Sequence, residues 1–536
     1  MKHSLSRLCA MALALACLAS LTACGEKTPS TPDNVPDAVI SDDATRIVLS
    51  NDSITVDGDA APTDETAAVY TAHDIVYYES GRDFTYGEGT AADAHDASEA
   101  DAHTVVHITE PGIYSVSGTL DAGQIAVDLG KGAKTDPDAV VELILDGVDL
   151  TCTVAPAIIF YNVYECDEAF VDYDDNDTET YRATKDVDTT AAGALLTLAD
   201  GSENVVNGSY VARIYKPESV ELSEDGTEVE DAKKLHKYDG AVYSKRSMNV
   251  GGSGTLTINA ENEGLDTELH LTINGGTINI FSGNDGINTN EDEVSVTTVN
   301  SGTLSVIVTG ETGEGDGIDS NGWIVINGGK VFSFACAKSM DSGLDADMGI
   351  YLNGGTVLAT GNMYDRIDGG QNYAVFQFAE RQRGDAVLTL KNAAGEVIFG
   401  HQAVNDYTYL VVADETLAAG DYTLWLGDTQ LAGAKVDSMG GFGGGMPMGQ
   451  PPEGFDPNGE RPEPPEDFDP EDFEGMRGER PEPPEGFDPN GERPEPPEGF
   501  GGRGDGGRGF GTEAAERSTA FTITDGANFF TSIAKA

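Results

Sequence analysis

The sequence predicts an all-β protein whose main body is a right-handed parallel β-helix. Short apolar runs bounded by glycine and aspartate are typical of strands, and no segment shows the sustained 3.6-residue apolar period of an amphipathic helix. The third observation is a repeat, because four glycine-containing tripeptides begin 26, 27 and 26 residues apart. They are Asn274-Gly275-Gly276, Asn300-Ser301-Gly302, Asn327-Gly328-Gly329 and Asn353-Gly354-Gly355.

The length of the repeat fits one coil of three short strands and three turns. A strand precedes and another follows each tripeptide, such as LTI and TINIF around Asn274. Parallel strands of successive coils would lie about 4.8 Å apart and leave free edges only at the ends of the stack. Asparagine and glycine tolerate the backbone of a sharp corner, so we expect the asparagines to hydrogen-bond along a ladder. We expect four aliphatic residues to face the interior: Ile278, Leu304, Val331 and Val357.

The N-terminal segment has the pattern of a bacterial lipoprotein signal. Basic residues precede an apolar run that is too short to span a membrane, and Leu21-Thr22-Ala23-Cys24 resembles a lipobox. We therefore predict a signal peptide over residues 1–23 and lipidation of Cys24, with an ordinary signal peptide as the alternative. Residues 24–66 are rich in Pro, Asp and Thr, which predicts a disordered tether from the extracellular face of the cell membrane.

The remaining segments follow from where the repeat begins and stops. We predict the β-helix over residues 104–372 and an antiparallel, β-sandwich-like cap over residues 373–437, completed by a strand at 518–533. Between these parts, residues 438–512 contain EGFDPNGERPEPPE twice and too few apolar residues to form a core. This stretch is therefore predicted to be a disordered acidic insertion.

Composition limits the partners of the protein. The chain of 536 residues has 93 acidic and 31 basic residues and a net charge of -62, which makes it unsuited to bind nucleic acid. Beyond Cys24, three cysteines remain, Cys152, Cys166 and Cys336, which allow at most one internal disulfide. A Cys152–Cys166 bond and buried free thiols are both compatible with the sequence.

A second motif returns once per coil and carries acidic residues. It is written EGLD at 263–266, DGIN at 285–288, DGID at 316–319 and SGLD at 342–345. If the coils stack, these carboxylates form columns, and two bare carboxylates about 4.8 Å apart repel by roughly 3 kcal/mol at an effective dielectric constant of 20. We expect a divalent cation to offset this repulsion. The predicted metal ligands are Glu263, Asp266, Asp285, Asn288, Asp316, Asp319, Asp341, Asp345, Asp347 and Asp368.

Calcium is the ion that these residue types favour. Ca²⁺ takes 6 to 8 oxygen ligands, whereas zinc would call for His or Cys, which the columns lack. The alternative is that the acidic residues only cap turns by accepting backbone hydrogen bonds.

Four stretches of the coils resemble the clostridial carbohydrate-binding domain-containing family, which comprises calcium-binding β-helix proteins of the cell surface. They are GIYSVSGTLDAGQIAVDL, LTLADGSENVV, DGAVYSKRSMNVGGSGTLTI and LTINGGTINIFSGNDGIN. The resemblance covers about residues 104–436 and the last strand. It implies bound calcium and adhesion to plant cell-wall polysaccharides such as cellulose or acidic pectin. The chain departs from the family pattern at Arg246 and Ser247, where two aspartates are common, and in an acidic insert at residues 164–192.

Three functions are compatible with these features. The first is a lipid-anchored, calcium-binding surface protein that binds polysaccharide without cleaving it. The second is a calcium-dependent pectate lyase, for which Arg366 is the strongest candidate base and Lys338 the next. The third is a structural or adhesive stalk stiffened by calcium. The sugar-binding residues stay unassigned, with Trp323, Tyr351 and Tyr373 as aromatic candidates.

Overall fold

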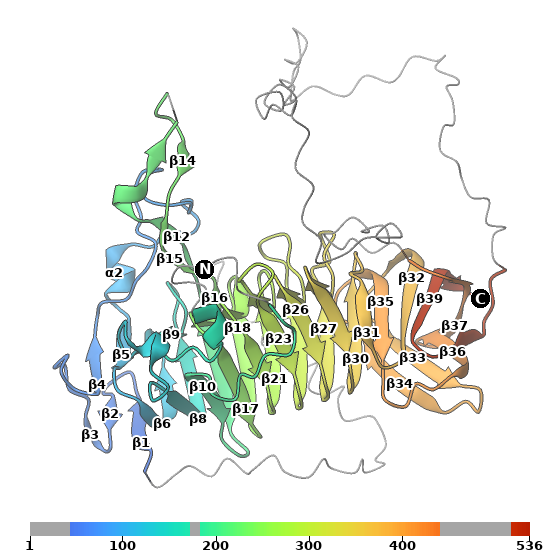
Figure 1. Cartoon of the computed structure of the whole chain (residues 1–536), viewed down its shortest axis with the longest axis horizontal. Coiled ribbons are helices and arrows are strands. Elements are labelled where there is room, and N and C mark those ends of the chain that lie inside the picture. The colour runs from blue at the N-terminus through green and yellow to red at the C-terminus, as the bar shows by residue number, and fades with distance from the viewer. Residues whose placement is uncertain (1–42, 172–182, 224, 440–515) are drawn as a thin grey trace, which may run out of the picture.

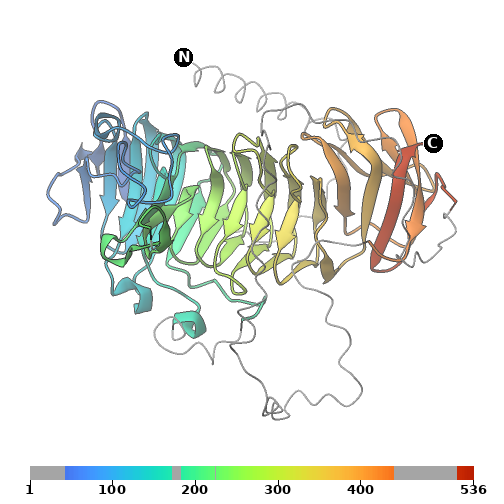
Figure 2. The same ribbon diagram turned by 90° about the horizontal axis from the view of Figure 1, so that it is seen from above.

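The computed structural model describes residues 43–171, 183–223, 225–439 and 516–536. Strands dominate these residues and stack along the long axis of the molecule (Figures 1 and 2). The helical elements in the described ranges are short: α2 (Ala97–Ala100), residues 168–171 and two 3₁₀ turns, Ala133–Thr135 and Pro217–Ser219. The predicted all-β class is confirmed.

Three ladders of parallel strands run along the stack. Ladder 1 continues from each strand to the next through parallel pairs. Its strands are β1 (Thr45–Leu49), β6 (Gly112–Leu120), β8 (Val141–Thr151), β10 (Ala194–Leu198), β17 (Met248–Gly252), β20 (Leu271–Ile273), β23 (Val296–Val299), β26 (Trp323–Ile326), β29 (Gly349–Leu352) and β31 (Ile367–Gly370).

Ladders 2 and 3 are built in the same way from the other strands of each coil. Ladder 2 branches from β8 and contains β11 (Glu203–Gly208), β18 (Thr255–Ala260), β21 (Thr277–Ser282), β24 (Thr303–Val308), β27 (Lys330–Phe334) and β30 (Thr356–Gly361). Ladder 3 contains β5 (Thr104–Ile108), β7 (Gly123–Asp128), β9 (Ile158–Asn162), β16 (Gly240–Ser244), β19 (Glu263–Thr267), β22 (Ile287–Thr289), β25 (Ile318–Ser320) and β28 (Leu344–Ala346).

Hydrophobic burial fixes the register between coils. Ile278, Leu304, Val331 and Val357 pair in sequence along ladder 2 and are at most 1% exposed, as predicted. Residues on either side of each one point outward because side chains alternate along a strand. A slip of one residue would turn this apolar row to solvent, so the register is strongly specified.

The asparagine corner forms the predicted ladder. The side-chain amide of Asn300 donates to the Asn274 side-chain oxygen at 2.8 Å, Asn327 donates to Asn300 at 2.9 Å and Asn353 donates to Asn327 at 2.8 Å. Two residues after Asn327, Gly329 has a φ of 77°, a conformation that glycine adopts without strain. The tripeptide repeat therefore marks the same corner in each of these four coils.

The strands after residue 372 form a C-terminal module of mostly antiparallel pairs. The last strand, β39, instead pairs in parallel with β32 and antiparallel with β37, so residues at the end of the chain lie among those before residue 440. The strands of this module are β32 (Tyr373–Gln382), β33 (Val387–Asn392), β34 (Val397–Gln402), β35 (Tyr407–Ala413), β36 (Gly420–Leu426), β37 (Thr429–Val436), β38 (Phe521–Ile523) and β39 (Ala527–Lys535).

The prediction of a disordered tether extending to residue 66 is wrong for its second half. Ile47 and Leu49 of β1 are 0% and 2% exposed and lie beside β6 in ladder 1. The segment TRIVL is short enough that the polar composition around it concealed its alternating pattern. The other early strands are β2 (Thr55–Val56), β3 (Asp59–Ala60) and β4 (Val69–Ala72).

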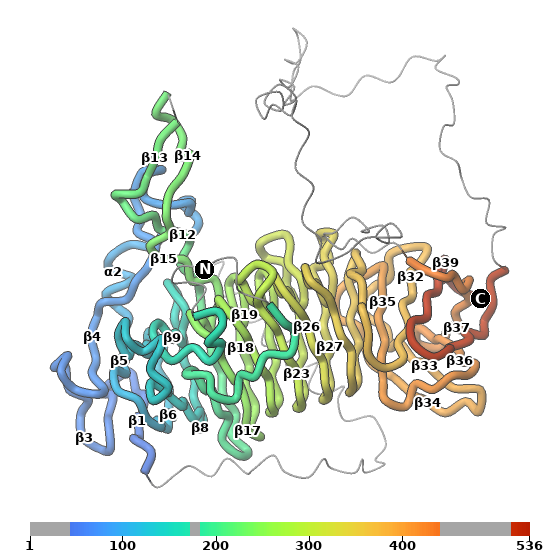
Figure 3. Tube along the Cα trace, in the orientation of Figure 1, coloured from blue at the N-terminus to red at the C-terminus, as the bar shows by residue number. Residues whose placement is uncertain are grey.

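An arm of four strands stands away from the stack, as the tube in Figure 3 shows. It consists of two antiparallel pairs, β12 with β15 and β13 with β14. The bounds are β12 (Val211–Tyr215), β13 (Glu221–Leu222), β14 (Val229–Asp231) and β15 (Lys234–Tyr238).

Several predictions concern residues outside the described ranges. These are the signal peptide, lipidation of Cys24 and nearly all of the acidic insertion. Within the described ranges, no helix has the length and apolar character needed to cross a bilayer. Cys152, Cys166 and Cys336 are free thiols, so the optional disulfide is not formed.

Candidate metal centre

The strand register brings the acidic residues of successive coils together. Along ladder 3, Asp266 pairs with Asn288, Asn288 with Asp319 and Asp319 with Asp345. A neighbouring column follows from backbone bonds, because Gly264 N–H donates to the Asp285 carbonyl and Gly286 N–H donates to the Asp316 carbonyl, both at 3.1 Å. The register that the repeat predicts for Asp266, Asn288, Asp319 and Asp345 is therefore confirmed.

The tightest group, the first acidic cluster, consists of Asp239, Glu263 and Asp266. Each contributes a carboxylate oxygen that lies within 4.8 Å of the other two, and the residues are 8%, 4% and 1% exposed. Asp239 comes from the turn before β16 and was missed by the sequence analysis. The Asp239-Gly240 pair, which precedes a buried strand as Glu263-Gly264 does, was the signal that could have identified it.

Burial and mutual repulsion make the ionised form of this cluster unfavourable. The pKa values of Glu263 and Asp266 are raised well above the ordinary range by burial first and by the neighbouring carboxylates second. Burial also raises the pKa of Asp239, although the Lys237 ammonium lies 2.8 Å from its carboxylate. A single lysine at one edge leaves most of the negative charge of the ionised cluster uncompensated.

Two oxygen atoms at the cluster have no hydrogen-bond partner within the described part of the chain, Glu263 Oε2 and Asn288 Oδ1. Asn288 Nδ2 donates to Glu263 Oε1 at 3.1 Å, which holds the two side chains together. Leaving a buried polar atom unsatisfied costs about 1–3 kcal/mol. Carboxylate and amide oxygens are the ligands that Ca²⁺ prefers, so the residues present fit a calcium ion that contacts both coils.

The second acidic cluster lies further along the stack and consists of Asp285, Asp316, Asp319 and Asp345. Burial is the largest cause of the raised pKa in each case, followed for Asp316 and Asp319 by neighbouring aspartates. The pKa is raised to about 7 for Asp285, about 8 for Asp319 and about 6 for Asp345.

Turn capping accounts for part of the second cluster. Asp285 Oδ1 accepts the Asp316 N–H at 2.6 Å, and Asp316 Oδ1 accepts the Ser342 N–H at 2.6 Å. Each of these bonds occupies one carboxylate oxygen. Turn capping and cation binding are therefore compatible in one residue, because the described residues donate no hydrogen bond to the second oxygen of Asp285 or Asp316.

Asp368 does not belong to the column in which it was predicted. Its strand β31 pairs with β29 of ladder 1, and its carboxylate lies 2.8 Å from the Arg366 guanidinium. The last coil is shorter than those before it, so Asp365 takes the place beside Asp345. Its Oδ2 accepts the Ala346 N–H at 3.1 Å, and burial followed by Asp345 raises its pKa to about 7.

The other predicted ligands lie at the edges of the second cluster. Asp341 Oδ2 accepts the Gly315 N–H at 2.7 Å and also a hydrogen bond from the Ser339 hydroxyl. Asp347 is exposed, and partial burial followed by repulsion from Asp292 raises its pKa.

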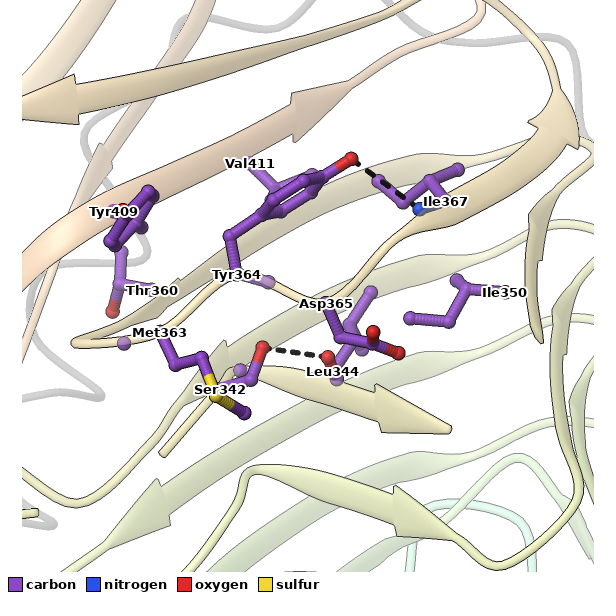
Figure 4. Close-up of a pocket in the computed structure, with 13 residues that line it drawn as sticks. Ser342, Leu344, Ile350, Thr360, Met363, Tyr364, Asp365, Ile367, Tyr409 and Val411 are labelled. Carbon is purple, nitrogen blue, oxygen red and sulfur yellow. Dashed lines mark hydrogen bonds between the residues drawn. The ribbon is translucent and has the colours of Figure 1, made fainter. Parts of the chain in front are cut away.

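Figure 4 shows a cavity beside Asp365 where the coils meet the C-terminal module. Its volume is about 10 Å³, and Ser342 Oγ at its edge donates to the Leu344 carbonyl at 2.7 Å. This space holds about one water molecule and is too small for a sugar.

The candidate catalytic and stacking residues are placed as follows. Arg366 is exposed and forms an ion pair with Asp368. Lys338 Nζ donates a hydrogen bond to the Gly310 carbonyl at 2.5 Å. Trp323 and Tyr373 are buried at 9% and 4% exposure, so their faces are not open to sugars.

The part of the chain that forms these coils is similar to known proteins. The family described as carbohydrate-binding domain-containing protein matches residues 102–209 and 192–374, which together make up just over half of the chain. The chain belongs to this family. A carbohydrate-binding domain-containing protein of Acetivibrio thermocellus is 29% identical over 176 residues, which are 33% of this chain and 44% of that relative. The match thus spans less than half of the relative's length.

A solved structure described as the polysaccharide lyase-like protein from C. thermocellum, gadolinium derivative, is also similar. The alignment covers 57% of this chain and 90% of that chain at 21% identity, with a TM-score of 0.32. That score is too low to support an argument about this protein.

At Ser247, where the sequence departs from the family pattern, a carboxylate from the acidic insert lies beside the coil. Ser247, where an aspartate is common in the family, donates from its backbone N–H and its hydroxyl to the Glu165 carboxylate at 2.9 and 2.8 Å. Glu165 is fully buried and also accepts the Asp167 N–H at 2.8 Å. The acidic insert therefore supplies a carboxylate to the coil that lacks one, and hydrogen bonds satisfy it.

Proposed function

We propose that this protein is a calcium-binding lipoprotein of the bacterial cell surface that binds plant cell-wall polysaccharide without cleaving it. Membership in the carbohydrate-binding domain-containing family supports the ligand class. The three parallel ladders support a right-handed parallel β-helix as its scaffold. The lipobox at Cys24 supports attachment to the extracellular face of the membrane.

The observation that carries the calcium proposal is a pair of buried oxygens, one on Glu263 of the first acidic cluster and one on the adjacent Asn288, for which the described residues supply no hydrogen-bond partner. Glu263 Oε2 and Asn288 Oδ1 come from successive coils and are buried, and no donor in the described part of the chain reaches either atom. A calcium ion there would replace the missing donors and offset the repulsion between Glu263 and Asp266. Since these residues are nearly inaccessible, this ion would join coils and would not reach a polysaccharide.

The second acidic cluster is the better place for calcium to meet an acidic polysaccharide. Asp319 and Asp345 are partly exposed, and Asp347 near them is exposed. Calcium has 6 to 8 coordination positions, so an ion held by two or three of these carboxylates keeps positions for the carboxylates of a uronate chain. Without the ion, a protein with a net charge of -62 would repel that chain.

Affinity electrophoresis of the full-length protein in gels that contain polygalacturonate tests this proposal. We expect retardation with calcium that disappears in EDTA and that is weakened in the Asp319→Asn, Asp345→Asn double variant. Retardation equal to that of an unrelated acidic protein in both buffers would instead support the stalk. Calcium-dependent release of unsaturated sugars that is lost in Arg366→Ala would instead establish a lyase.

A further inference from the structure

A groove on the outer face of ladder 1 is separate from both acidic clusters. Its volume is about 540 Å³, within the 300–1,000 Å³ range of ligand sites. Two rows of outward side chains form its floor. The inner row pairs Asn249 with Thr272 and Thr272 with Thr298, and the outer row begins at Thr197, which pairs with Gly251. Asn249 and Thr272 are only 9% and 5% exposed. The open floor is therefore formed by Thr197 and Thr298 and by the exposed Asn274, Asn300 and Asn327, whose hydroxyl and amide groups come from successive coils about 4.8 Å apart.

A segment of the acidic insert, residues 185–190, forms one wall of the groove. Thr189 anchors it, because its hydroxyl lies 3.0 Å from Asn249 Oδ1 and 2.6 Å from the Thr272 hydroxyl, and its carbonyl accepts Asn249 Nδ2 at 2.6 Å. Val187 packs against the apolar group that includes Trp323 and Val325. This wall belongs to the insert that distinguishes the chain from the family pattern.

Gly251 leaves room in the floor where the next coils carry Asn274 and Asn300. A side-chain carbon placed at Gly251 would meet its nearest neighbour, Asn274 Cβ, at 3.9 Å, which is ordinary contact. Gly251 does not have a positive φ, so a larger residue is accommodated without backbone strain. The groove therefore owes part of its width to this glycine.

The charges at the rim determine which glycans fit. Lys185 Nζ lies 2.6 Å from Asp186 Oδ1, so these two charges offset each other. Asp188 adds a negative charge to the wall, and Thr197 in the floor donates to Glu142 Oε1 at 2.7 Å. A polyuronate carries one carboxylate per sugar, which the negative charges beside the groove would repel. An uncharged glycan chain would not be repelled.

We propose that this groove binds an uncharged polyhydroxylated glycan chain, such as a β-1,4-glucan, without calcium. The inference rests on the proposed function and adds a second mode of binding to it. Hydroxyls and amides both donate and accept hydrogen bonds, which is the chemistry that sugar hydroxyls require. Calcium at the second acidic cluster would serve acidic chains, and the groove serves neutral ones.

Isothermal titration of the full-length protein with cello-oligosaccharides in EDTA tests the groove. We expect measurable binding by the wild type, at least a tenfold loss in Gly251→Tyr, and about 2- to 10-fold weaker binding in Thr298→Val, which removes one hydroxyl. Thr257→Tyr is the matched control, because it adds the same side chain to the outer face of β18, away from the groove. Its affinity is expected to equal that of the wild type.

The outcomes separate this inference from the function it builds on. Calcium-dependent retention on polygalacturonate together with no binding of cello-oligosaccharides would overturn the groove and leave the proposed function standing. Loss of retention on both ligands would overturn both. Equal cello-oligosaccharide affinity in Gly251→Tyr and the wild type, with unchanged melting temperature, would also overturn the groove.

Discussion

Replacing Glu263 by glutamine is expected to change stability in opposite directions with and without calcium. The ionised Glu263 carboxylate faces those of Asp239 and Asp266, with oxygens within 4.8 Å of one another. At that distance and an effective dielectric constant of 20, each pair repels by about 3 kcal/mol. In EDTA at neutral pH, the folded chain avoids the repulsion of these two pairs by protonating Glu263, which costs about 3 kcal/mol at pH 7 for a carboxyl of ordinary pKa 4.5. Glu263→Gln removes this cost and should raise the free energy of unfolding by about 3 kcal/mol.

Calcium should reverse this advantage. At a concentration 100 times its Kd, an ion bound at one site stabilises the folded state by about 2.7 kcal/mol. For a folded body of roughly 400 residues, an unfolding entropy of about 2.1 cal/mol/K per residue makes 1 kcal/mol correspond to about 1.2 °C, so the wild type should gain about 3 °C in Tm. Glu263→Gln loses a charged ligand and should gain less than half of that shift.

Differential scanning calorimetry in EDTA and in calcium measures both effects. Glu261→Gln is the control, because Glu261 is exposed and accepts a hydrogen bond from Ser209 at 2.9 Å, away from the cluster. It should leave the calcium shift unchanged. A Glu263→Gln variant that is less stable than the wild type in both buffers would refute the reasoning and make Glu263 a structural acceptor only.

Four further predictions follow from the same structure. Because the folded-state pKa of Asp319 is raised to about 8 from an ordinary 3.8, the folded chain binds more protons than the unfolded chain between these values. In EDTA, Tm should fall as the pH rises from 4 to 8, and Asp319→Asn should flatten this profile; a Tm that rises over this range in EDTA would contradict it. Asn300→Ala removes two ladder bonds and should lower the free energy of unfolding by about 1–2 kcal/mol in denaturant titrations, equally with and without calcium. Asp365→Asn should reduce the calcium-induced Tm shift, whereas Asp368→Asn should leave it unchanged. A shift that is reduced only in Asp368→Asn would show that Asp368, and not Asp365, belongs to the acidic column. Burial lowers the pKa of His401, stacked at 4.0 Å on Phe332, to about 4, so its contribution is present above pH 6.5 and is lost as the pH falls through 4; His401→Phe should remove this acid sensitivity in melting curves.

The coil register was predictable because it is written as a repeat. Each Asn-Gly-Gly-like tripeptide marks the same corner, so the spacing from Asn274 to Asn300 gives the strand pairing directly. The column from Asp266 to Asp345 follows from that register with no further information. Periodic features of this kind depend on one neighbour relation that recurs along the chain.

The exceptions occurred where the period changes. The last coil is short, so counting tetrapeptides selected Asp368 although Asp365 lies beside Asp345. Asp239 lies before the regular coils begin and joins the first acidic cluster from an irregular turn. In β1, five residues of strand were hidden within a polar segment.

Contacts of the acidic insert could not be predicted from the sequence. Thr189 reaches Asn249 and Thr272 across 60 and 83 residues, and no periodic pattern links them. The groove depends on this contact and on the small side chain of Gly251. Long-range packing of a single, non-repeated segment is visible only once the fold places it.

A crystal structure of the protein grown with calcium tests the central claim most directly. The account predicts an ion with oxygen ligands at about 2.3–2.6 Å, contacted by Glu263 Oε2 and Asn288 Oδ1 from successive coils. Finding a water molecule or the Lys237 ammonium in that position, with no ion at either acidic cluster, would contradict it.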